Sequence, residues 1–228
     1  MKRIGIVGGL GPESTVDYYR TMVNEIRGME AGEAPEIIIY SLNLKDFPPI
    51  EQKDAVIAWL VGAIRALERA GADFAIISAN TPHIFYNEVK ELSPLSLLSI
   101  VEETAAVVRS MGLTKVGLLG TGITMSSDYY HEVFKRHNIE IVVPKRNEQD
   151  YVVDKLFSEI MFNRIVEETR RNLLRIVKRM VDEDLIQGLI LGCTELPLIL
   201  QHDEYGIPFL NTTKIHVKGA IRYYTTES

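Results

Sequence analysis

The chain has 228 residues, of which 46% are hydrophobic and 25% charged, enough for one large or two small domains with buried cores. Its formal net charge of −6, with no basic stripe, argues against nucleic acid or another polyanion as a partner. No stretch approaches the ~20 apolar residues of a membrane span, and a single cysteine, which excludes an intrachain disulfide, fits a reducing, cytoplasmic location.

Short apolar runs alternate with helical patterns along the chain, which predicts an α/β fold with parallel strands and right-handed crossovers. The expected strands are 4–7, 36–41, 74–78, 116–119, 140–143 and 188–191. The expected helices are 13–27, 54–70, 102–111, 128–137, a long one over 150–182 with a break near Asn163, and a final one over 216–224 that packs back on the first half. We expect Asp54 to cap the second helix, and Gly71 and Gly112 to end the second and third.

The two halves of the chain resemble each other. RIGIVGG near the start recurs as KVGLLGT, placing Ile4 on Val116 at an offset of 112 residues, and VDYYR recurs as SDYYH at an offset of 111. AIISANTPH and LILGCTELP match at an offset of 114, which places Ala79 on Cys193. We therefore expect two pseudo-symmetric domains, 1–100 with 211–228 and 101–210, each a parallel sheet flanked by helices, with a ligand cleft between them and positions 79 and 193 facing each other.

The carboxyl ends of the predicted strands carry the polar and glycine-rich segments. In open parallel sheets, ligands collect at these ends. The four segments are 8–12, 78–83, 120–124 and 192–197. Glycines let the backbone approach a ligand closely, and hydroxyl and N–H groups hold a carboxylate. These features predict an anionic small molecule as ligand.

Nucleotide and metal sites are disfavoured. GGLGPES lacks the third glycine of a dinucleotide fingerprint, since Ser14 stands there, and Glu13 would oppose a pyrophosphate. The five histidines, which we expect mostly at the surface or as caps, show no metal-ligand spacing. We expect neither a metal nor a cofactor.

Cys193 is the candidate for chemistry. A free thiol has a pKa of about 8.5, and a helix N-terminus lowers it. Thr194 and Glu195 follow directly, which predicts a strand-to-helix turn with the sulfur near backbone N–H groups. The alternative is that Cys193 is a small buried hydrophobe.

Several motifs resemble the aspartate/glutamate racemase superfamily. LILGCTELPLI is similar to its second signature, and ISANTPH to its first with the cysteine replaced. GGLGPEST, LLGTGITMSSDYY and TTKIHVKGAI are also similar to segments of its amino acid racemases, so the resemblance runs nearly end to end. It implies two α/β domains, no pyridoxal phosphate and no metal, a small amino acid substrate, often a homodimer, and two thiols that act on opposite faces of the substrate α-carbon.

The resemblance also implies roles for individual residues. Cys193 carries over as one acid/base. The residues at the positions that bind the substrate carboxylate in the family are Asn80, Thr81, Thr121 and Thr194. The glycine-rich loop around Leu10 lines the pocket. Donors at a carboxylate stabilise the extra negative charge that develops when the α-proton leaves. Glu51 and Glu159 are candidates for the substrate ammonium group, or else solvated surface acids.

Ala79 departs from the family pattern, because it stands where the first catalytic cysteine belongs and a methyl group transfers no proton. The alanine is either natural or an introduced substitution. Ser78, Thr81 or water would then have to return the proton, which predicts one-sided or weak racemisation. A second departure is that KDFPPIEQ, residues 45–52, has no arginine where aspartate-specific members hold the substrate side chain.

Two alternatives follow from these departures. The first is a one-thiol enzyme resembling arylmalonate decarboxylases, in which a single cysteine protonates an enolate formed by loss of carbon dioxide. The second is a carboxylate-binding protein without catalysis. Ala79 favours the second alternative, and the intact context of Cys193 opposes it.

Overall fold

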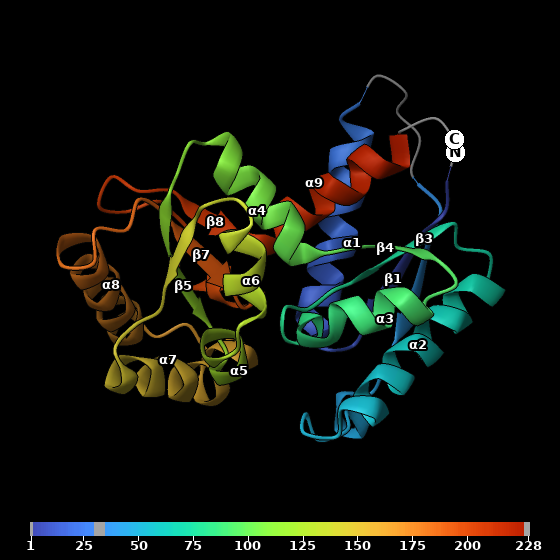
Figure 1. Cartoon of the computed structure of the whole chain (residues 1–228), viewed down its shortest axis with the longest axis horizontal. Helices are drawn as coiled ribbons and strands as arrows, with labels where there is room; N and C mark the ends of the chain where they lie inside the picture. The colour runs from blue at the N-terminus through green and yellow to red at the C-terminus, as the bar shows by residue number, and fades with distance from the viewer. Residues whose placement is uncertain (1, 30–34, 226–228) are drawn as a thin grey trace. The chain divides into compact units, whose positions relative to one another are not determined.

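The computed structural model describes residues 2–29 and 35–225 (Figure 1). The chain divides into two compact units, Met1–Glu103 with Thr213–Ser228, and Thr104–Thr212. Across the described residues it forms two sheets of four parallel strands, one in each unit. Within the same ranges, no helix is long and apolar enough to cross a membrane.

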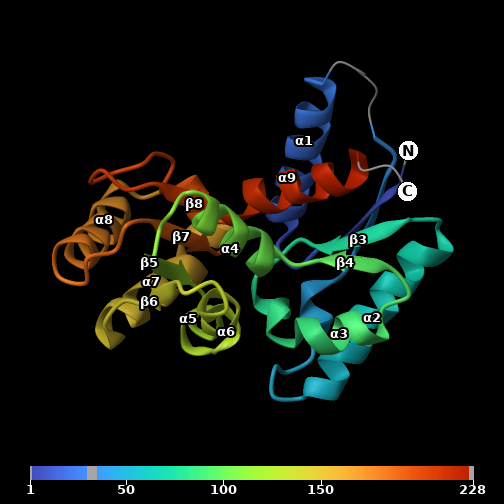
Figure 2. The ribbon, with the colours of Figure 1, turned by 45° about the horizontal axis from the view of Figure 1, so that its top comes forward.

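The first unit is a parallel sheet covered by helices on both faces. Its strands are β1 (Ile4–Gly8), β2 (Ile37–Ser41), β3 (Phe74–Ile77) and β4 (Ser96–Leu98), in the order β2-β1-β3-β4. Its helices are α1 (Pro12–Arg27), α2 (Lys53–Arg69), α3 (Tyr86–Leu92), most of α9 (Thr212–Thr225) and the start of α4 (Ile100–Ser110). Side chains alternate between the faces of a strand, so Ile4 and Ile6 of β1 pack with α1 and α9, whereas Val7 packs with α2. Figure 2 shows α1 and α9 on one side of β3 and β4, and α2 and α3 on the other.

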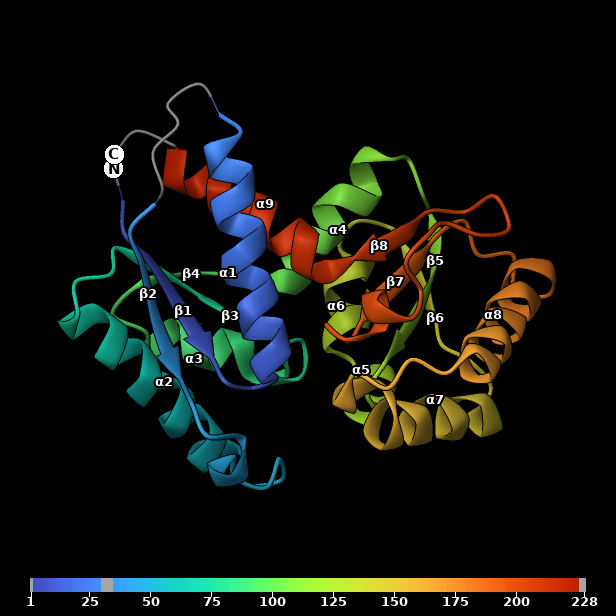
Figure 3. The same cartoon turned by 180° about the vertical axis from the view of Figure 1, so that it is seen from behind.

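The second unit repeats this arrangement. Its strands are β5 (Lys115–Gly120), β6 (Glu140–Val142), β7 (Leu189–Gly192) and β8 (Phe209–Asn211), in the order β6-β5-β7-β8. Its helices are α5 (Gly122–Ser126), α6 (Tyr129–Lys135), α7 (Arg146–Ser158) and α8 (Glu167–Asp182). Leu119, Leu189 and Leu191 form a buried cluster with apolar residues of α7 and α8, which lie along one side of the sheet in Figure 3. Both faces of each central strand are therefore buried, as the continuous apolar runs require.

The strand registers repeat between the units as well. Gly5 of β1 pairs with Ala75 of β3, and Gly117 of β5 pairs with Leu189 of β7. These pairs differ by 112 residues in the first strand and by 114 in the second, the offsets found in the sequence. The shared topology and register support the predicted duplication. The offset of 114 also places Ala79 and Cys193 at equivalent positions beyond β3 and β7.

Most predicted elements are confirmed, and the errors lie at short or edge elements. The segment expected as one long helix over 150–182, with a break near Asn163, forms two helices: α7 begins earlier, at Arg146, and α8 begins at Glu167. Asn163, between them, has a left-handed backbone conformation. Asp54 does not cap α2, because Gln52 holds that position and Asp54 lies in the first turn. Gly71 ends α2 as predicted: its N–H donates to the Glu68 carbonyl, and the next N–H donates to the Leu67 carbonyl. The strands β4 and β8 and the helices α3 and α5 were not predicted.

Candidate active site

Cys193 lies directly beyond the carboxyl end of β7. Gly192, the last residue of β7, pairs with Gly120 at the end of β5. Cys193 and Thr121 each follow one of these paired glycines, so they emerge side by side from adjacent strands. Thr194 and Glu195 continue the chain from Cys193 into a three-residue 3₁₀ helix, Leu196–Leu198. The second unit thus brings three predicted site residues, Cys193, Thr121 and Thr194, to one edge of its sheet.

The thiol of Cys193 is buried and bonded to a carboxylate. Its Sγ donates to Glu195 Oε2 at 3.0 Å, and the Thr194 hydroxyl donates to the same oxygen at 2.9 Å. Burial and the negative charge of Glu195 raise the pKa of the thiol well above its usual value, while the backbone N–H groups of Thr194 and Glu195 act in the opposite direction. The expected lowering of the pKa by a helix N-terminus is therefore wrong, because desolvation and the carboxylate outweigh the N–H groups. Cys193 is held as a protonated donor beside a base.

Thr124 connects the two strand ends. A Cβ on Gly120 would lie 2.7 Å from the Thr124 methyl group, and one on Gly192 would lie 3.2 Å from it, so Thr124 packs over both glycines. Its backbone N–H donates to the Thr121 Oγ1 at 3.2 Å, and the two hydroxyl oxygens are 3.0 Å apart. The Tyr129 hydroxyl donates to Thr124 Oγ1 at 3.1 Å. Thr124 and Tyr129 were not predicted from the sequence; the LLGTGITMSSDYY segment was the available signal.

The equivalent edge of the first unit surrounds position 79. Ala79 is half-buried, two residues beyond β3, and Asn80 and Thr81 follow it at the start of a short 3₁₀ helix. Asn80 is buried, whereas Thr81 is half-buried. Ser78 is fully buried, and its hydroxyl donates to the Val7 carbonyl at 3.1 Å. That proton is committed to the backbone, which argues against Ser78 as a substitute for the missing thiol.

Two histidines of the first unit are structural and buried, which corrects the expectation of surface or capping roles for them. His83 Nδ1 lies 2.9 Å from the Ala79 carbonyl, and its Nε2 accepts the Ile100 N–H at 3.3 Å, so His83 fixes the loop after β3. His216 Nδ1 lies 3.0 Å from the Tyr18 hydroxyl. Burial lowers the pKa of His83 to about 4 and that of His216 to about 3, so both rings are neutral at pH 7. His131, His137 and His202 are exposed or half-buried.

The loop after β1 can be built only with glycine at its first position. Gly9 has φ +82°, and a Cβ there would lie 1.9 Å from the Leu42 carbonyl oxygen. Its N–H donates to Thr15 Oγ1 at 2.9 Å, which ties the loop to α1. Leu10 follows, half-buried, and packs against the apolar cluster of β1, α2 and β3.

The two candidate ammonium contacts differ in their surroundings. Glu51 is exposed in the turn before α2. Glu159 already binds two partners, Lys155 Nζ at 2.9 Å and the Thr169 hydroxyl at 2.5 Å, and both contacts lower the pKa of its carboxyl group. Because both of its oxygens are engaged, Glu159 joins α7 to α8, which favours a structural role.

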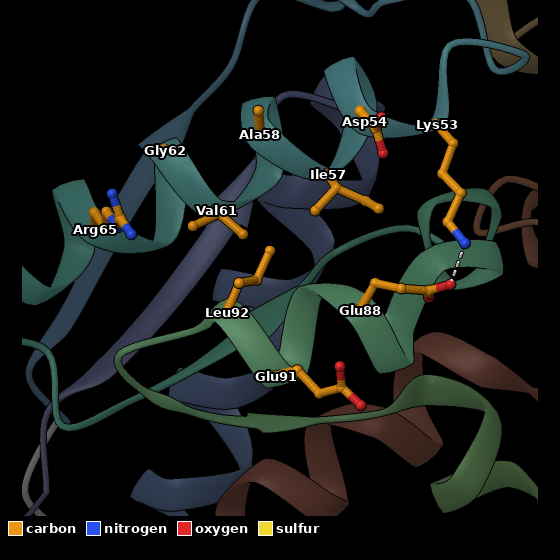
Figure 4. Close-up of a pocket in the computed structure, with 10 residues that line it drawn as sticks. All are labelled: Lys53, Asp54, Ile57, Ala58, Val61, Gly62, Arg65, Glu88, Glu91 and Leu92. Carbon is orange, nitrogen blue, oxygen red and sulfur yellow. Dashed lines mark ion pairs between the residues drawn. The ribbon is translucent and has the colours of Figure 1, made fainter.

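A shallow groove of about 640 Å³ lies between α2 and α3 in the first unit (Figure 4). Ile57, Val61 and Leu92 form its apolar floor, and Lys53 Nζ pairs with Glu88 Oε1 at 2.5 Å at one end. None of the predicted site residues lines it. Within the described part of the chain, no three His, Cys, Asp or Glu side chains are grouped as metal ligands would be.

Residues 7–220 match the family model of the Asp/Glu/Hydantoin racemases. The chain belongs to this family. The match spans both units and includes Cys193, Ala79 and the strand ends around them. The resemblance noted from the sequence motifs is thereby confirmed, and the chain is a member of an isomerase family of amino acid racemases.

Relatives of known sequence or structure agree with this assignment. The chain is 26% identical over 227 residues to the broad specificity amino-acid racemase RacX of Bacillus subtilis (strain 168), with 97% of each chain covered. It is 34% identical to an aspartate racemase homologue from Pyrococcus horikoshii OT3, at a TM-score of 0.85 over 99% of this chain and 100% of the other. The glutamate racemase of Francisella tularensis, solved with D-glutamate, shares the fold at a TM-score of 0.72 and 18% identity, covering 99% of this chain and 84% of the other.

Proposed function

We propose that the chain is a cofactor-independent amino acid racemase family enzyme that removes and returns the α-proton of a small amino acid from one face. The observation that carries the proposal is the hydrogen bond from Cys193 Sγ to Glu195 Oε2 at 3.0 Å, at a strand end beside Thr121. A thiol paired with a carboxylate base is equipped to exchange a proton with a carbon acid.

The proton transfers balance within this pair. The thiol proton of Cys193 moves to Glu195, which leaves a thiolate and a carboxylic acid. The thiolate then takes the α-proton of the substrate, so Cys193 becomes a thiol again and the substrate becomes a carbanion conjugated with its carboxylate. Return of a proton from the same thiol regenerates the substrate with its configuration retained, and the carboxylic acid of Glu195 then gives its proton back to the Cys193 thiolate. Between the two transfers the thiol can exchange its proton with water. In deuterated water the returned proton is replaced by deuterium.

The carbanion needs hydrogen-bond donors at the substrate carboxylate, where its negative charge accumulates. The family resemblance assigns this carboxylate to Asn80, Thr81, Thr121 and Thr194. These side chains carry amide or hydroxyl donors, and a carboxylate is an acceptor only. Donors aimed at this position stabilise the transition state more than the bound amino acid.

Ala79 makes the reaction one-sided. Position 79 is where the family carries its first catalytic cysteine, the partner of Cys193, and a methyl group offers no proton. Because the Ser78 proton is committed to the Val7 carbonyl, the Thr81 hydroxyl and water are the donors left for inversion. We therefore infer that exchange with retention is faster than racemisation.

The substrate is inferred to be a small amino acid whose side chain is not held by an arginine of the enzyme. Residues 45–52 carry no arginine, although aspartate-specific members place one there. The relative named for broad specificity fits a pocket without such an anchor. A panel should therefore include alanine, serine and glutamate besides aspartate.

The test is loss of the α-proton NMR signal in deuterium oxide, with separate L- and D-amino acids. Wild type is expected to exchange at least one of them, and Cys193→Ser none, because the serine hydroxyl is a far weaker acid than a thiol. Ala79→Cys, which restores the second thiol, is expected to convert exchange into racemisation. Absence of exchange from the whole panel would refute the proposal.

A second candidate is decarboxylation of a disubstituted malonate, followed by protonation of the enolate by Cys193. The observation that favours it is the raised pKa of the thiol, since that reaction needs only a protonated donor on one face. Release of carbon dioxide from a phenylmethylmalonate, abolished by Cys193→Ser, would support it. Ligand-dependent stabilisation without either reaction would instead indicate a carboxylate-binding protein.

We further propose that the protein is a homodimer in the cytoplasm and that its two domains are residues 1–100 with 211–228, and 101–210. The family resemblance supports the dimer, and the single cysteine supports a reducing compartment. The compact units, divided at Glu103 and Thr212, support the domain division. Light scattering of the purified chain tests the dimer, because a monomer has a mass of 25.8 kDa.

A further inference from the structure

We propose that Tyr129 is a positioning residue that fixes the Thr121 hydroxyl as a hydrogen-bond donor for the substrate carboxylate. The inference rests on the proposed function, because it assigns a purpose to a buried hydroxyl chain at the edge that carries Cys193. This chain of hydrogen bonds runs from the Tyr129 hydroxyl through that of Thr124 to that of Thr121. In this proposal Tyr129 acts on the substrate through its hydrogen bond to Thr124.

The direction of each hydrogen bond follows from donor and acceptor counts. A hydroxyl group has one proton and two acceptor positions. The Tyr129 hydroxyl donates to Thr124 Oγ1 at 3.1 Å. Thr124 is fully buried, and the remaining partner of its hydroxyl is Thr121 Oγ1, 3.0 Å away. The Thr124 proton therefore points to Thr121, because a buried hydroxyl that keeps its proton unbonded loses free energy.

Thr121 consequently accepts twice. Its Oγ1 receives the Thr124 hydroxyl and also the Thr124 backbone N–H at 3.2 Å. Both acceptor positions are then occupied, so whatever else Thr121 meets through its hydroxyl, it meets as a donor. A carboxylate can only accept, whereas an ammonium group can only donate. The hydrogen bonds that begin at Tyr129 thus make Thr121 a donor that binds the carboxylate of an amino acid and not its ammonium group.

The packing keeps this arrangement in place. The Thr124 methyl group lies against Gly120 and Gly192, so its hydroxyl has little freedom to turn. Tyr129 is buried and lies close enough to Cys193 for a thiolate there to raise the pKa of its phenol. Loss of the Tyr129 hydroxyl would free the acceptor position on Thr124. The bond between the two threonines could then reverse, and the Thr121 proton would turn inward.

The test compares Tyr129→Phe with Tyr130→Phe, which removes the hydroxyl of the next residue in the same helix, also buried. For the amino acid that wild type exchanges, Tyr129→Phe is expected to raise KM by about threefold to tenfold, the range for one hydrogen bond to a charged group that is weakened rather than lost. Tyr130→Phe is expected to leave KM unchanged, although its melting temperature falls.

A second background separates positioning from general destabilisation. In Thr121→Val, which has no hydroxyl to orient, adding Tyr129→Phe is expected to change kcat/KM no further. The inference is overturned if Tyr129→Phe leaves KM unchanged in the native background, or if it lowers kcat/KM equally in both backgrounds. If wild type exchanges no amino acid, the proposed function fails, and thermal stabilisation by the same acids is compared instead. Loss of stabilisation in Tyr129→Phe alone supports the inference, and stabilisation that is equal in all variants, or absent from wild type, refutes it.

Discussion

Replacement of Glu195 by glutamine separates the supply of thiolate from the transfer of its proton. In the native chain the Cys193 thiol donates to Glu195 Oε2 at 3.0 Å, and the carboxylate charge contributes to the raised pKa of the thiol. Glutamine keeps the size of the side chain and one oxygen acceptor but removes the charge. The thiol pKa should therefore fall, so more thiolate is present at a given pH. The base that receives the thiol proton is nevertheless lost.

The larger fraction of thiolate should speed α-proton exchange, whereas loss of the base should slow it, and we expect the loss of the base to dominate. A positioned general base contributes about 10²- to 10⁴-fold to a proton transfer, so the rate of α-deuterium exchange should fall by that factor in Glu195→Gln. The free energy of unfolding should change by less than about 2 kcal/mol, because weaker hydrogen bonds from Cys193 and Thr194 are offset by removal of a buried charge. Activity is thus expected to fall while the protein stays folded and its thiol becomes more reactive.

The assay pairs NMR exchange rates with the pH profile of Cys193 methylthiolation, read by mass spectrometry. In Glu195→Gln the profile should move to lower pH. Glu204→Gln is the matched control, since Glu204 belongs to the same unit and pairs with Arg170 at 3.0 Å. An unchanged exchange rate would refute Glu195 as the base, and an unchanged profile would refute its control of the thiol pKa.

Two predictions concern stability. Gly9→Ala should cost about 3 to 5 kcal/mol or prevent folding, because φ is +82° and the added Cβ meets the Leu42 carbonyl; urea denaturation measures it, and a loss under 1 kcal/mol would contradict the geometry. The buried neutral histidines should make stability fall with acid. Their folded pKa values, about 4 for His83 and about 3 for His216, lie below the usual 6.5. The stabilising contribution of each neutral ring is therefore fully present above pH 6.5 and is lost at about 1.4 kcal/mol per pH unit between 6.5 and the folded pKa. The melting temperature should therefore fall between pH 7 and 4, and it should fall less steeply with pH in His216→Gln.

The sequence predicts the central strands because their apolar runs are continuous and bounded by glycines. The strands β4 and β8, Ser96–Leu98 and Phe209–Asn211, escaped prediction because each has only three residues, at a sheet edge, and contains just two apolar ones. The edge strand β6 is equally short, but it was predicted because the apolar residues continue beyond it to Val143. The helix α5 is likewise one turn, and it begins at Gly122, a residue more typical of a helix end. Local patterns suffice for long elements, whereas short ones depend on the neighbours that they pair with.

The site shows the same limit. The position of Cys193 beyond a buried strand follows from the sequence, and so does that of Thr121, which also follows a predicted strand; the pairing of Gly120 with Gly192 places the two residues side by side. The state of the thiol does not, because it depends on the Glu195 side chain folding back onto the sulfur instead of pointing to solvent. The histidines were misjudged for a related reason: spacing along the chain does not reveal that His83 bonds the Ala79 carbonyl, nor that His216 meets Tyr18 across nearly the whole sequence.

The most direct test of the one-sided mechanism follows α-deuterium content and enantiomer ratio in the same wild-type sample. One enantiomer of the best substrate is incubated in deuterium oxide, and chiral chromatography with mass spectrometry reads both quantities over time. The account predicts that deuterium enters the starting enantiomer well before the opposite enantiomer accumulates, because Cys193 returns the proton to the face it came from. Inversion that keeps pace with deuterium incorporation from the start would contradict it, since a second proton donor would then act opposite Cys193.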